Sequence, residues 1–145
     1  MFEQVGKRST RYCLEGYNCT IFAYGQTGSG KTFTMMGVDP AHEQYDELRG
    51  LIPRTLEYLF EAIDLEIREM SSEYIIRCSF LEIYNEQIID LLDTRNNTNL
   101  QIREDIRKGV YVEGVTEETI FKGEEALEML KKGSKGRHVG STCYN

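Results

Sequence analysis

The sequence predicts an α/β fold in which helices cover a mainly parallel central sheet. Residues 19–24 form a short apolar run with β-branched and aromatic side chains, as in a parallel strand that is buried on both faces. A glycine-rich turn and then a helix-forming stretch follow this run directly, and a second β-rich stretch begins only after another long helical pattern. Strands that alternate with helices in this way are typical of a three-layer α/β fold.

The first fifty residues are predicted to hold helices on both sides of this strand. Apolar side chains at helical spacing over residues 2–13 indicate an opening helix, and Gly16 is its expected stop. Another helix is expected from Lys31, directly after the glycine-rich turn. Residues 37–50 contain glycines, a proline and several acidic side chains, and we expect them to interrupt this helix as a surface loop.

The longest predicted helix begins near Pro53, a residue suited to the first turn of a helix. Beyond this helix, the side chains of residues 74–84 are β-rich and alternate as in a strand with two different faces. An apolar turn over residues 88–92 is expected to follow this strand. The helix itself is predicted from a stripe of apolar side chains that recurs every three or four residues: Ile52, Leu56, Leu59, Phe60, Ile63, Ile67 and Met70.

The last third of the chain is predicted to contain short strands and one helix. Residues 100–120 hold two or three strands, with a hairpin turn at 107–109, and a helix is expected from about 124 to 133. No repeat, low-complexity tract or linker divides the sequence. We therefore expect a single domain over residues 1–145.

Composition limits the kinds of partner. The formal net charge is −7, whereas a nucleic-acid-binding domain is expected to be basic, so nucleic acid is a poor candidate. The four cysteines form no CxxC pair, and we interpret them as free thiols in a reducing compartment. No stretch of about 18 apolar residues is present, so no membrane insertion is expected. These properties predict a cytoplasmic protein.

A phosphate-binding motif occupies residues 25–32. This segment matches the pattern G-x-x-x-x-G-K-[ST] at every fixed position. Glycines let backbone N–H groups wrap closely around an anion, the lysine ammonium reaches the β- and γ-phosphates of a nucleotide, and the final hydroxyl ligates Mg²⁺. The predicted ATP- and Mg²⁺-binding residues are Gly25, Gln26, Thr27, Gly28, Ser29, Gly30, Lys31 and Thr32, with Thr32 as the metal ligand. The expected fold is therefore of the P-loop NTPase type.

No complete catalytic constellation accompanies this loop. Asp90 follows two isoleucines and superficially resembles the acid that holds Mg²⁺ in P-loop enzymes, but it fits better as a polar position on a short amphipathic turn. His42 and His138 each stand alone and are interpreted as surface residues. No DxxG-type γ-phosphate sensor occurs in the sequence.

Four segments in order resemble the kinesin motor domain, in details that go beyond a generic P-loop. The segment from Thr20 to Gly37 resembles the nucleotide-binding loop of kinesins; it reads TIFAYGQTGSGKTFTMMG. Within the family, this segment resembles the kinesin-12 group. Gly50-Leu-Ile-Pro-Arg54 is similar to the restart of the family's second helix. Ser79 to Glu86, with Asp90-Leu-Leu92, resembles the SxxEIYNExxxDLL signature. Arg137 to Thr142, with Asn145, resembles the approach to switch I, although Gly136 and Tyr144 depart from the family pattern there.

The resemblance implies an ATP-driven motor that moves along microtubules and belongs to the cytoskeleton. It also implies that the chain is less than half of a motor core, with an incomplete sheet, because the family's first strand, the remainder of switch I and all of switch II have no counterpart here. Residues 37–50 correspond to the family's loop 5. The resemblance places Arg103, Arg107 and Lys108 in the loop 8 region, which touches tubulin in kinesins. Ordinary solvation of a hairpin explains these three residues equally well.

Two other functions remain as alternatives. A truncated or degenerate kinesin-like binding module without ATPase activity would also lack the switch segments. An unrelated P-loop NTPase, such as a kinase or a GTPase, would share the loop, but the order of the four segments and the absence of an NKxD motif argue against it. Whether the isolated chain is an enzyme is left open by its sequence, whereas the parent protein is expected to be a microtubule-dependent ATPase.

Overall fold

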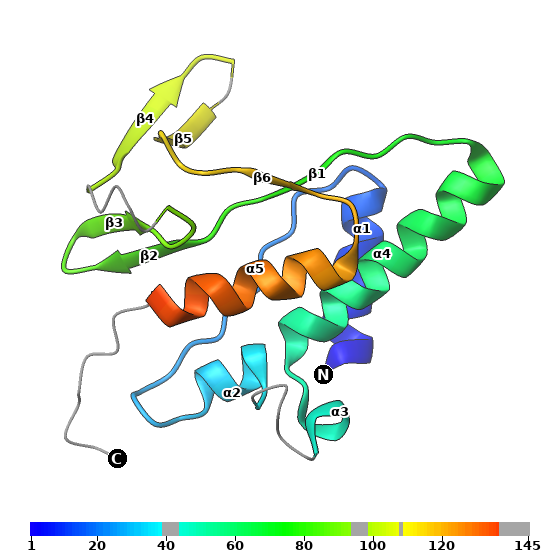
Figure 1. Cartoon of the computed structure of the whole chain (residues 1–145), viewed down its shortest axis with the longest axis horizontal. Helices are drawn as coiled ribbons and strands as arrows, with labels where there is room; N and C mark the ends of the chain where they lie inside the picture. The colour runs from blue at the N-terminus through cyan, green and yellow to red at the C-terminus, as the bar shows by residue number, and fades with distance from the viewer. Residues whose placement is uncertain (39–43, 94–98, 108, 137–145) are drawn as a thin grey trace. The chain divides into compact units, whose positions relative to one another are not determined.

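The structure is a computed structural model that describes residues 1–38, 44–93, 99–107 and 109–136. The chain divides into two compact units, the first over residues 1–73 and the second beginning at Tyr74. Among the described residues, the first unit is built from helices and carries the glycine-rich loop, and the second contains the strands together with one helix (Figure 1). None of the helices in the described part of the chain is long and apolar enough to cross a membrane.

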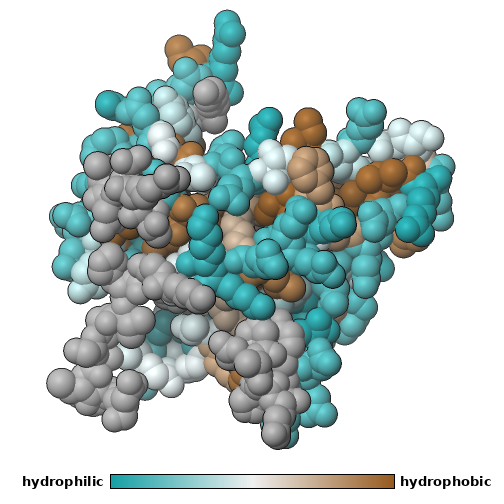
Figure 2. Space-filling model, viewed as in Figure 1, coloured by the Kyte–Doolittle hydropathy of each residue, from teal (hydrophilic) through white to brown (hydrophobic). Residues whose placement is uncertain are grey.

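The longest helix, α4 (Leu51–Met70), organises the first unit and confirms the helix predicted from the apolar stripe. Phe60 and Ile63 of that stripe are buried, and so is Leu51 at the first position of the helix. The C-terminal end of the stripe is uncovered, because Ile67 and Met70 are exposed. Figure 2 shows the corresponding apolar surface along α4. The sequence pattern therefore identified the helix correctly, while only part of its apolar face is packed.

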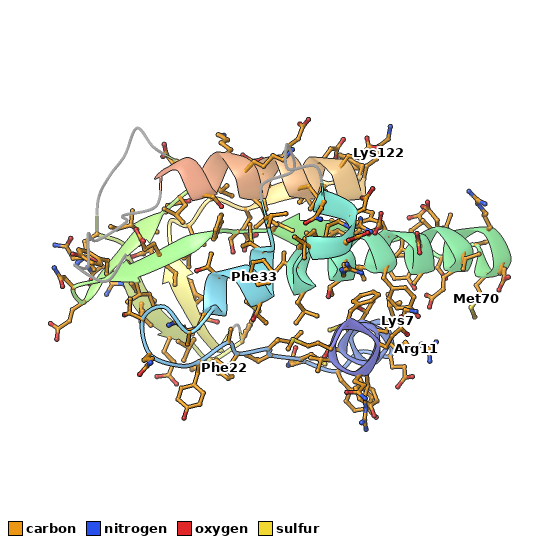
Figure 3. All side chains as sticks on the ribbon, turned by 90° about the horizontal axis from the view of Figure 1, so that it is seen from below. Lys7, Arg11, Phe22, Phe33, Met70 and Lys122 are labelled. Atoms are coloured by element: carbon orange, nitrogen blue, oxygen red, sulfur yellow. The ribbon has the colours of Figure 1, made fainter. Side chains whose placement is uncertain are left out.

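Two shorter helical segments pack against α4 and confirm the predicted opening helix. A π-helical turn, η1 (Phe2–Gly6), leads directly into α1 (Lys7–Leu14). Tyr58 of α4 joins both: its ring meets Phe2 edge-on at 6.1 Å, and its hydroxyl accepts a hydrogen bond from Arg11 Nε at 3.1 Å. Lys7 Nζ lies 5.5 Å from the centre of the same ring, a cation–π contact. Figure 3 labels Lys7 and Arg11 on α1.

The predicted loop over residues 37–50 connects two helices, and its two ends lie side by side. It separates α2 (Lys31–Met36) from α4. Its two ends are joined, because Gly37 and Arg49 form an antiparallel bridge and Gly50 N donates to Met36 O at 3.2 Å. Within it lies α3 (Tyr45–Leu48), a single helical turn that sequence reasoning did not anticipate. Residues 39–43 of the predicted loop lie outside the described residues.

The predicted buried parallel strand over residues 19–24 is not observed in this structure. The segment is extended but pairs with no strand among the described residues. Its side chains do alternate: Ile21 and Ala23 are half-buried, whereas Phe22 is 86% exposed and Tyr24 is 96% exposed. Figure 3 places Phe22 on this unpaired segment. A strand that is apolar on both faces needs neighbours on both faces, and the described residues cover only one.

All strand pairs in the second unit are antiparallel, so the predicted parallel sheet is not observed. The predicted strand over 74–84 is divided into β1 (Ile76–Cys78) and β2 (Leu81–Tyr84). β2 turns through Asn85 and Glu86, both with positive φ, into β3 (Gln87–Asp90), where an apolar turn had been expected. Two residues with positive φ suit a tight hairpin, because this turn matches the twist of the strands.

The remaining strands and the last helix are close to their predicted places. β4 (Gln101–Asp105) and β5 (Gly109–Glu113) form the hairpin expected at 107–109. β6 (Glu118–Ile120) pairs with β1, and α5 (Gly123–Gly136) packs against β6, starting and ending within a few residues of the prediction. The buried apolar side chains of this unit come from β3 and the residues directly after it, from β6 and from α5: Ile88, Leu91, Leu92, Ile120, Ala126 and Met129.

Candidate functional site

The glycine-rich loop runs from the unpaired segment into α2, as the motif predicts. Residues 26–30 form a turn flanked by bends, and α2 begins at Lys31. Ser29 N donates to Gln26 O at 3.2 Å, which tightens the middle of the loop. Gly28 and Gly30 have φ values of 80° and 85°, in the left-handed region that only glycine adopts without strain. The local sequence therefore determines this loop without help from a sheet.

Lys31 is held inside the loop by main-chain oxygens. Its ammonium nitrogen lies 2.8 Å from Gly25 O and 2.7 Å from Gln26 O. These contacts hold the positive charge beside the loop, and the backbone N–H groups of such a loop can donate hydrogen bonds to an anion. Sequence reasoning did not foresee these two contacts, since a carbonyl group is present at every residue and leaves no signal in the sequence.

The surroundings of the loop are open and partly apolar. A hollow of about 380 Å³ lies beside it, lined by Ile21, Ala23 and Met35 among other apolar side chains and by the polar Ser29, Lys31 and Thr34. Thr32 is the first residue of α2 after the lysine, and it is exposed. An ideal Cβ on Gly28 or Gly30 would meet no heavy atom within 4 Å, so space for a bulky anion remains at these positions.

The donors present fit a nucleotide phosphate with Mg²⁺. A phosphate needs backbone N–H groups and a cation, which the loop and Lys31 supply. Mg²⁺ binds oxygen atoms and is usually held by few protein side chains together with phosphate oxygens and water. Thr32 would contribute its hydroxyl, and no group of three or more His, Cys, Asp or Glu side chains that could hold a metal occurs among the residues the structure describes.

Asp90 is not a metal ligand but a buried structural carboxylate at the end of β3. Its Oδ1 accepts hydrogen bonds from Leu92 N at 2.9 Å and Asp93 N at 3.4 Å, and its Oδ2 accepts one from Thr116 N at 2.6 Å. Asp90 therefore ends a strand, where an amphipathic turn was predicted, and its side chain is buried. Both carboxylate oxygens are already used by backbone donors.

The hydrogen bonds to Asp90 also control its ionisation. Burial by itself would raise the pKa of this carboxyl group, but the backbone and hydroxyl donors of Thr116 and the N–H groups of Leu92 and Asp93 outweigh it and lower the pKa below its ordinary value. The carboxylate is thus charged in the folded state over the whole neutral range. It ties the end of the β2–β3 hairpin to the segment that precedes β6.

Two of the three residues that the resemblance places in the loop 8 region, Arg103 and Arg107, belong to the β4–β5 hairpin. Arg103 lies on β4, and its Nε donates to Glu113 Oε2 on β5 at 3.0 Å in an exposed ion pair. This hydrogen bond raises the pKa of Arg103 further. Arg107 is exposed in the turn, and its backbone N–H donates to Asp105. Lys108 lies outside the described residues, as do His42, His138 and the segment over 137–145.

Comparison with known proteins gives consistent matches over the whole chain. The family profile described as "Kinesin motor domain" matches residues 1–145. Kinesin-like protein KIF15 of Rattus norvegicus is 48% identical over 147 residues, which cover 100% of this chain and 10% of the relative. KIF15 of Homo sapiens gives the same identity and coverage. Kinesin-like protein KIN-12D of Arabidopsis thaliana is 48% identical over 149 residues, covering 100% of this chain and 5% of the relative. The chain thus spans at most 10% of the length of these relatives.

Proposed function

Because this chain belongs to the kinesin motor family, we propose that it is the ATP-binding segment of a motor that moves along microtubules. Family membership also makes its fold that of a P-loop NTPase of the α/β class. The observation that carries the proposal is the loop over residues 25–32, in which main-chain oxygens hold the Lys31 ammonium among backbone donors. An unrelated P-loop kinase or GTPase is set aside by the family match.

The proposed role of the loop is to bind and orient the nucleotide phosphates. Backbone N–H groups of residues 26–30 would donate to the phosphate oxygens, while Lys31 would exchange its contacts with Gly25 O and Gln26 O for the β- and γ-phosphates. Phosphoryl transfer of this kind depends on positioning and charge stabilisation rather than on covalent chemistry of the protein. In the whole protein, loss of the γ-phosphate would then alter the grip on tubulin.

Thr32 is proposed to hold Mg²⁺ through its hydroxyl oxygen. The metal supplies charge neutralisation between the β- and γ-phosphates when it is bound. The exposure of Thr32 at the start of α2 leaves its side chain accessible to an ion beside the loop. The residue is thus suited to contribute one ligand and leave the others to phosphate and water.

Replacement of Thr32 by valine is expected to remove the benefit of Mg²⁺ for nucleotide binding to this chain. Valine keeps the shape of threonine but lacks the oxygen. Titration of a fluorescent ATP analogue with and without Mg²⁺ should show tighter binding with the metal in the wild type, and no such difference in Thr32→Val. Thr119→Val, at an exposed position on β6, should behave like the wild type. An undiminished effect of Mg²⁺ in Thr32→Val would contradict the assignment.

We propose that residues 19–24 become a buried strand of a parallel sheet when further strands of the motor domain flank them. The alternating exposure of Ile21 to Tyr24 supports this proposal, because the backbone is already extended and its uncovered face is apolar. A three-layer fold with a mainly parallel central sheet, and a single domain over residues 1–145, remain part of the same proposal. The chain spans a tenth or less of the length of the curated relatives it matches, and a longer protein would supply the proposed partner strands.

Amide hydrogen exchange tests this proposal directly. Exchange at residues 20–24 is expected to be fast in the 145-residue chain, where no ladder protects these amides, and at least about 10²-fold slower in a chain that carries a complete motor domain. Residues 56–63 of α4 serve as the internal control and should be protected in both proteins. Equal exchange at residues 20–24 in the two proteins would refute the buried strand.

The microtubule contact is proposed to involve the turn of the β4–β5 hairpin. Arg107 is exposed there, and Arg103 is exposed beside it although it is paired with Glu113. We expect the positive charges of these two arginines and of Lys108 to bind the tubulin surface. The proposed location of the whole protein is the cytoplasmic microtubule cytoskeleton. Microtubule-stimulated ATP turnover, treated in the Discussion, separates this motor from a kinesin-like binding module without activity.

A further inference from the structure

The helix that carries Lys31 and Thr32 has little support of its own. α2 is six residues long, and none of its residues is buried. Even the large ring of Phe33 is exposed on its surface (Figure 3). A helix shorter than about 12 residues is marginal in water unless other parts of the protein hold it. The position of Lys31 and Thr32 at the start of α2 therefore depends on what holds the other end of this helix.

Main-chain contacts hold the end of α2 against the last residues of the connecting loop over 37–50. Gly50 N donates to Met36 O at 3.2 Å, and Gly37 forms an antiparallel bridge with Arg49. The two segments lie so close together that a Cβ atom on Gly50 would clash with the last turn of α2. The end of α2 can therefore keep its place only if Arg49 and Gly50 keep theirs.

Arg54 of α4 holds this part of the connecting loop by its carbonyl oxygens. Its Nε donates to Arg49 O at 3.0 Å, and its Nη2 donates to Asp46 O at 3.1 Å and to Glu47 O at 3.0 Å. Asp46 and Glu47 belong to α3, and the last carbonyl groups of a helix have no partner within it. A planar guanidinium group with several fixed donors suits such a set of acceptors. One cation thereby gathers three carbonyl groups.

Glu57 provides a second contact to Arg49, about one turn further along α4. Its Oε2 accepts a hydrogen bond from Arg49 Nη1 at 2.9 Å. Arg49 is therefore held twice, through its carbonyl oxygen by Arg54 and through its side chain by Glu57. Half of the Glu57 side chain is exposed, and exposed ion pairs contribute little to stability. We therefore expect Arg54 to be the more important of the two residues.

We propose that Arg54 is a positioning residue for nucleotide binding. Arg54 fixes Arg49, the bridge from Arg49 fixes the end of α2, and α2 carries Lys31 and Thr32 at its start. Without the guanidinium group, α2 would be free to move, and an incoming nucleotide would have to order it. This inference rests on the proposed nucleotide site over residues 25–32. It adds a residue that acts on that site only through the main chain of the connecting loop.

Replacement of Arg54 by alanine in a chain with a complete motor domain should raise the KM for ATP by about tenfold and change kcat little. Bound nucleotide would restore the position of α2, and the free energy needed for this weakens binding rather than turnover of the bound complex. Lys31→Met differs because it should lower kcat itself. The measurement is microtubule-stimulated turnover over a range of ATP concentrations. Arg68→Ala, at an exposed position on α4, is the matched control and should keep both constants.

Amide exchange in the 145-residue chain tests the same role without nucleotide. In Arg54→Ala, the amides of residues 34–37 should exchange at least about tenfold faster than in the wild type, while residues 58–63 of α4 keep their protection. Added guanidinium ion at a millimolar concentration should slow this exchange again, whereas the same concentration of sodium chloride should not. Arg54→Lys keeps the charge but not the planar donors, so its exchange should lie between those of the wild type and Arg54→Ala.

A second variant reaches the same contact without touching Arg54. Gly50→Ala adds a methyl group that clashes with the last turn of α2, so it should raise the KM for ATP as well, and guanidinium ion should not correct it. A wild-type KM in both variants, or unchanged exchange at residues 34–37 in Arg54→Ala, would overturn the role of Arg54. Faster exchange at residues 58–63 as well would assign Arg54 to general stability and also overturn it. Absence of ATP turnover in the wild-type motor domain would instead overturn the proposed function.

Discussion

Replacement of Lys31 by methionine in a chain with a complete motor domain is expected to lower microtubule-stimulated ATP turnover by about 10²–10³-fold or more. Lys31 supplies the only side-chain charge that the structure places inside the loop over residues 25–32, and the transferring phosphoryl group needs that charge. Methionine keeps the aliphatic stem of lysine, so packing around α2 should be preserved. The measurement is phosphate release over a range of microtubule concentrations at saturating ATP.

Two controls make this result specific to the nucleotide site. Lys122→Met removes an exposed lysine from the second unit and should leave turnover unchanged. Circular dichroism and thermal unfolding should show that Lys31→Met remains folded, although it loses the hydrogen bonds to Gly25 O and Gln26 O. Normal turnover in a folded Lys31→Met would show that the site is misplaced. Absence of microtubule-stimulated turnover in the wild-type motor domain would instead favour a kinesin-like binding module.

Replacement of Asp90 by asparagine is expected to destabilise the second unit by about 2–4 kcal/mol at neutral pH. The buried carboxylate accepts hydrogen bonds from three backbone N–H groups, those of Leu92, Asp93 and Thr116. Asparagine replaces one of the two accepting oxygens with a donor, so at least one buried N–H group loses its acceptor. The measurement is urea denaturation, together with amide exchange at Leu92 and Thr116. Asp64→Asn, at an exposed position on α4, is the matched control and should change stability little.

The contribution of Asp90 should also depend on pH in a defined direction. Its pKa is lowered in the folded state, so its stabilising effect is complete above the ordinary aspartate pKa of about 3.9 and is lost as the pH falls through the lower folded value. The stability difference between wild type and Asp90→Asn should therefore be constant near neutral pH and shrink only in strong acid. A difference that already shrinks between pH 7 and pH 5 would contradict the lowered pKa.

The sequence alone determined the features that depend on neighbouring residues. The glycines at 28 and 30 and the lysine at 31 specify the loop through their own backbone preferences and charge. The apolar stripe over 52–70 specifies α4, because its period is that of a helix, and the turn around Gly109 specifies the β4–β5 hairpin. The four segments, which occur in the same order as in kinesins, were also enough to indicate the family, and the family profile matches residues 1–145.

Only the tertiary structure decided which strands pair and what the buried polar groups do. Residues 19–24 have the composition of a buried strand, but a strand forms only where partners far away in the sequence supply hydrogen bonds and cover both faces. The stretch over residues 74–84, predicted as one strand, contains two strands with different partners. β1 pairs with β6, and β2 pairs with β3. Asp90 was predicted as a polar position on an amphipathic turn, because sequence shows neither the burial of a side chain nor the three backbone donors, two close by and one 26 residues away, that bind it. Local preference fixes a loop or a helix, whereas long-range contacts decide the pairing of strands and the role of a buried charge.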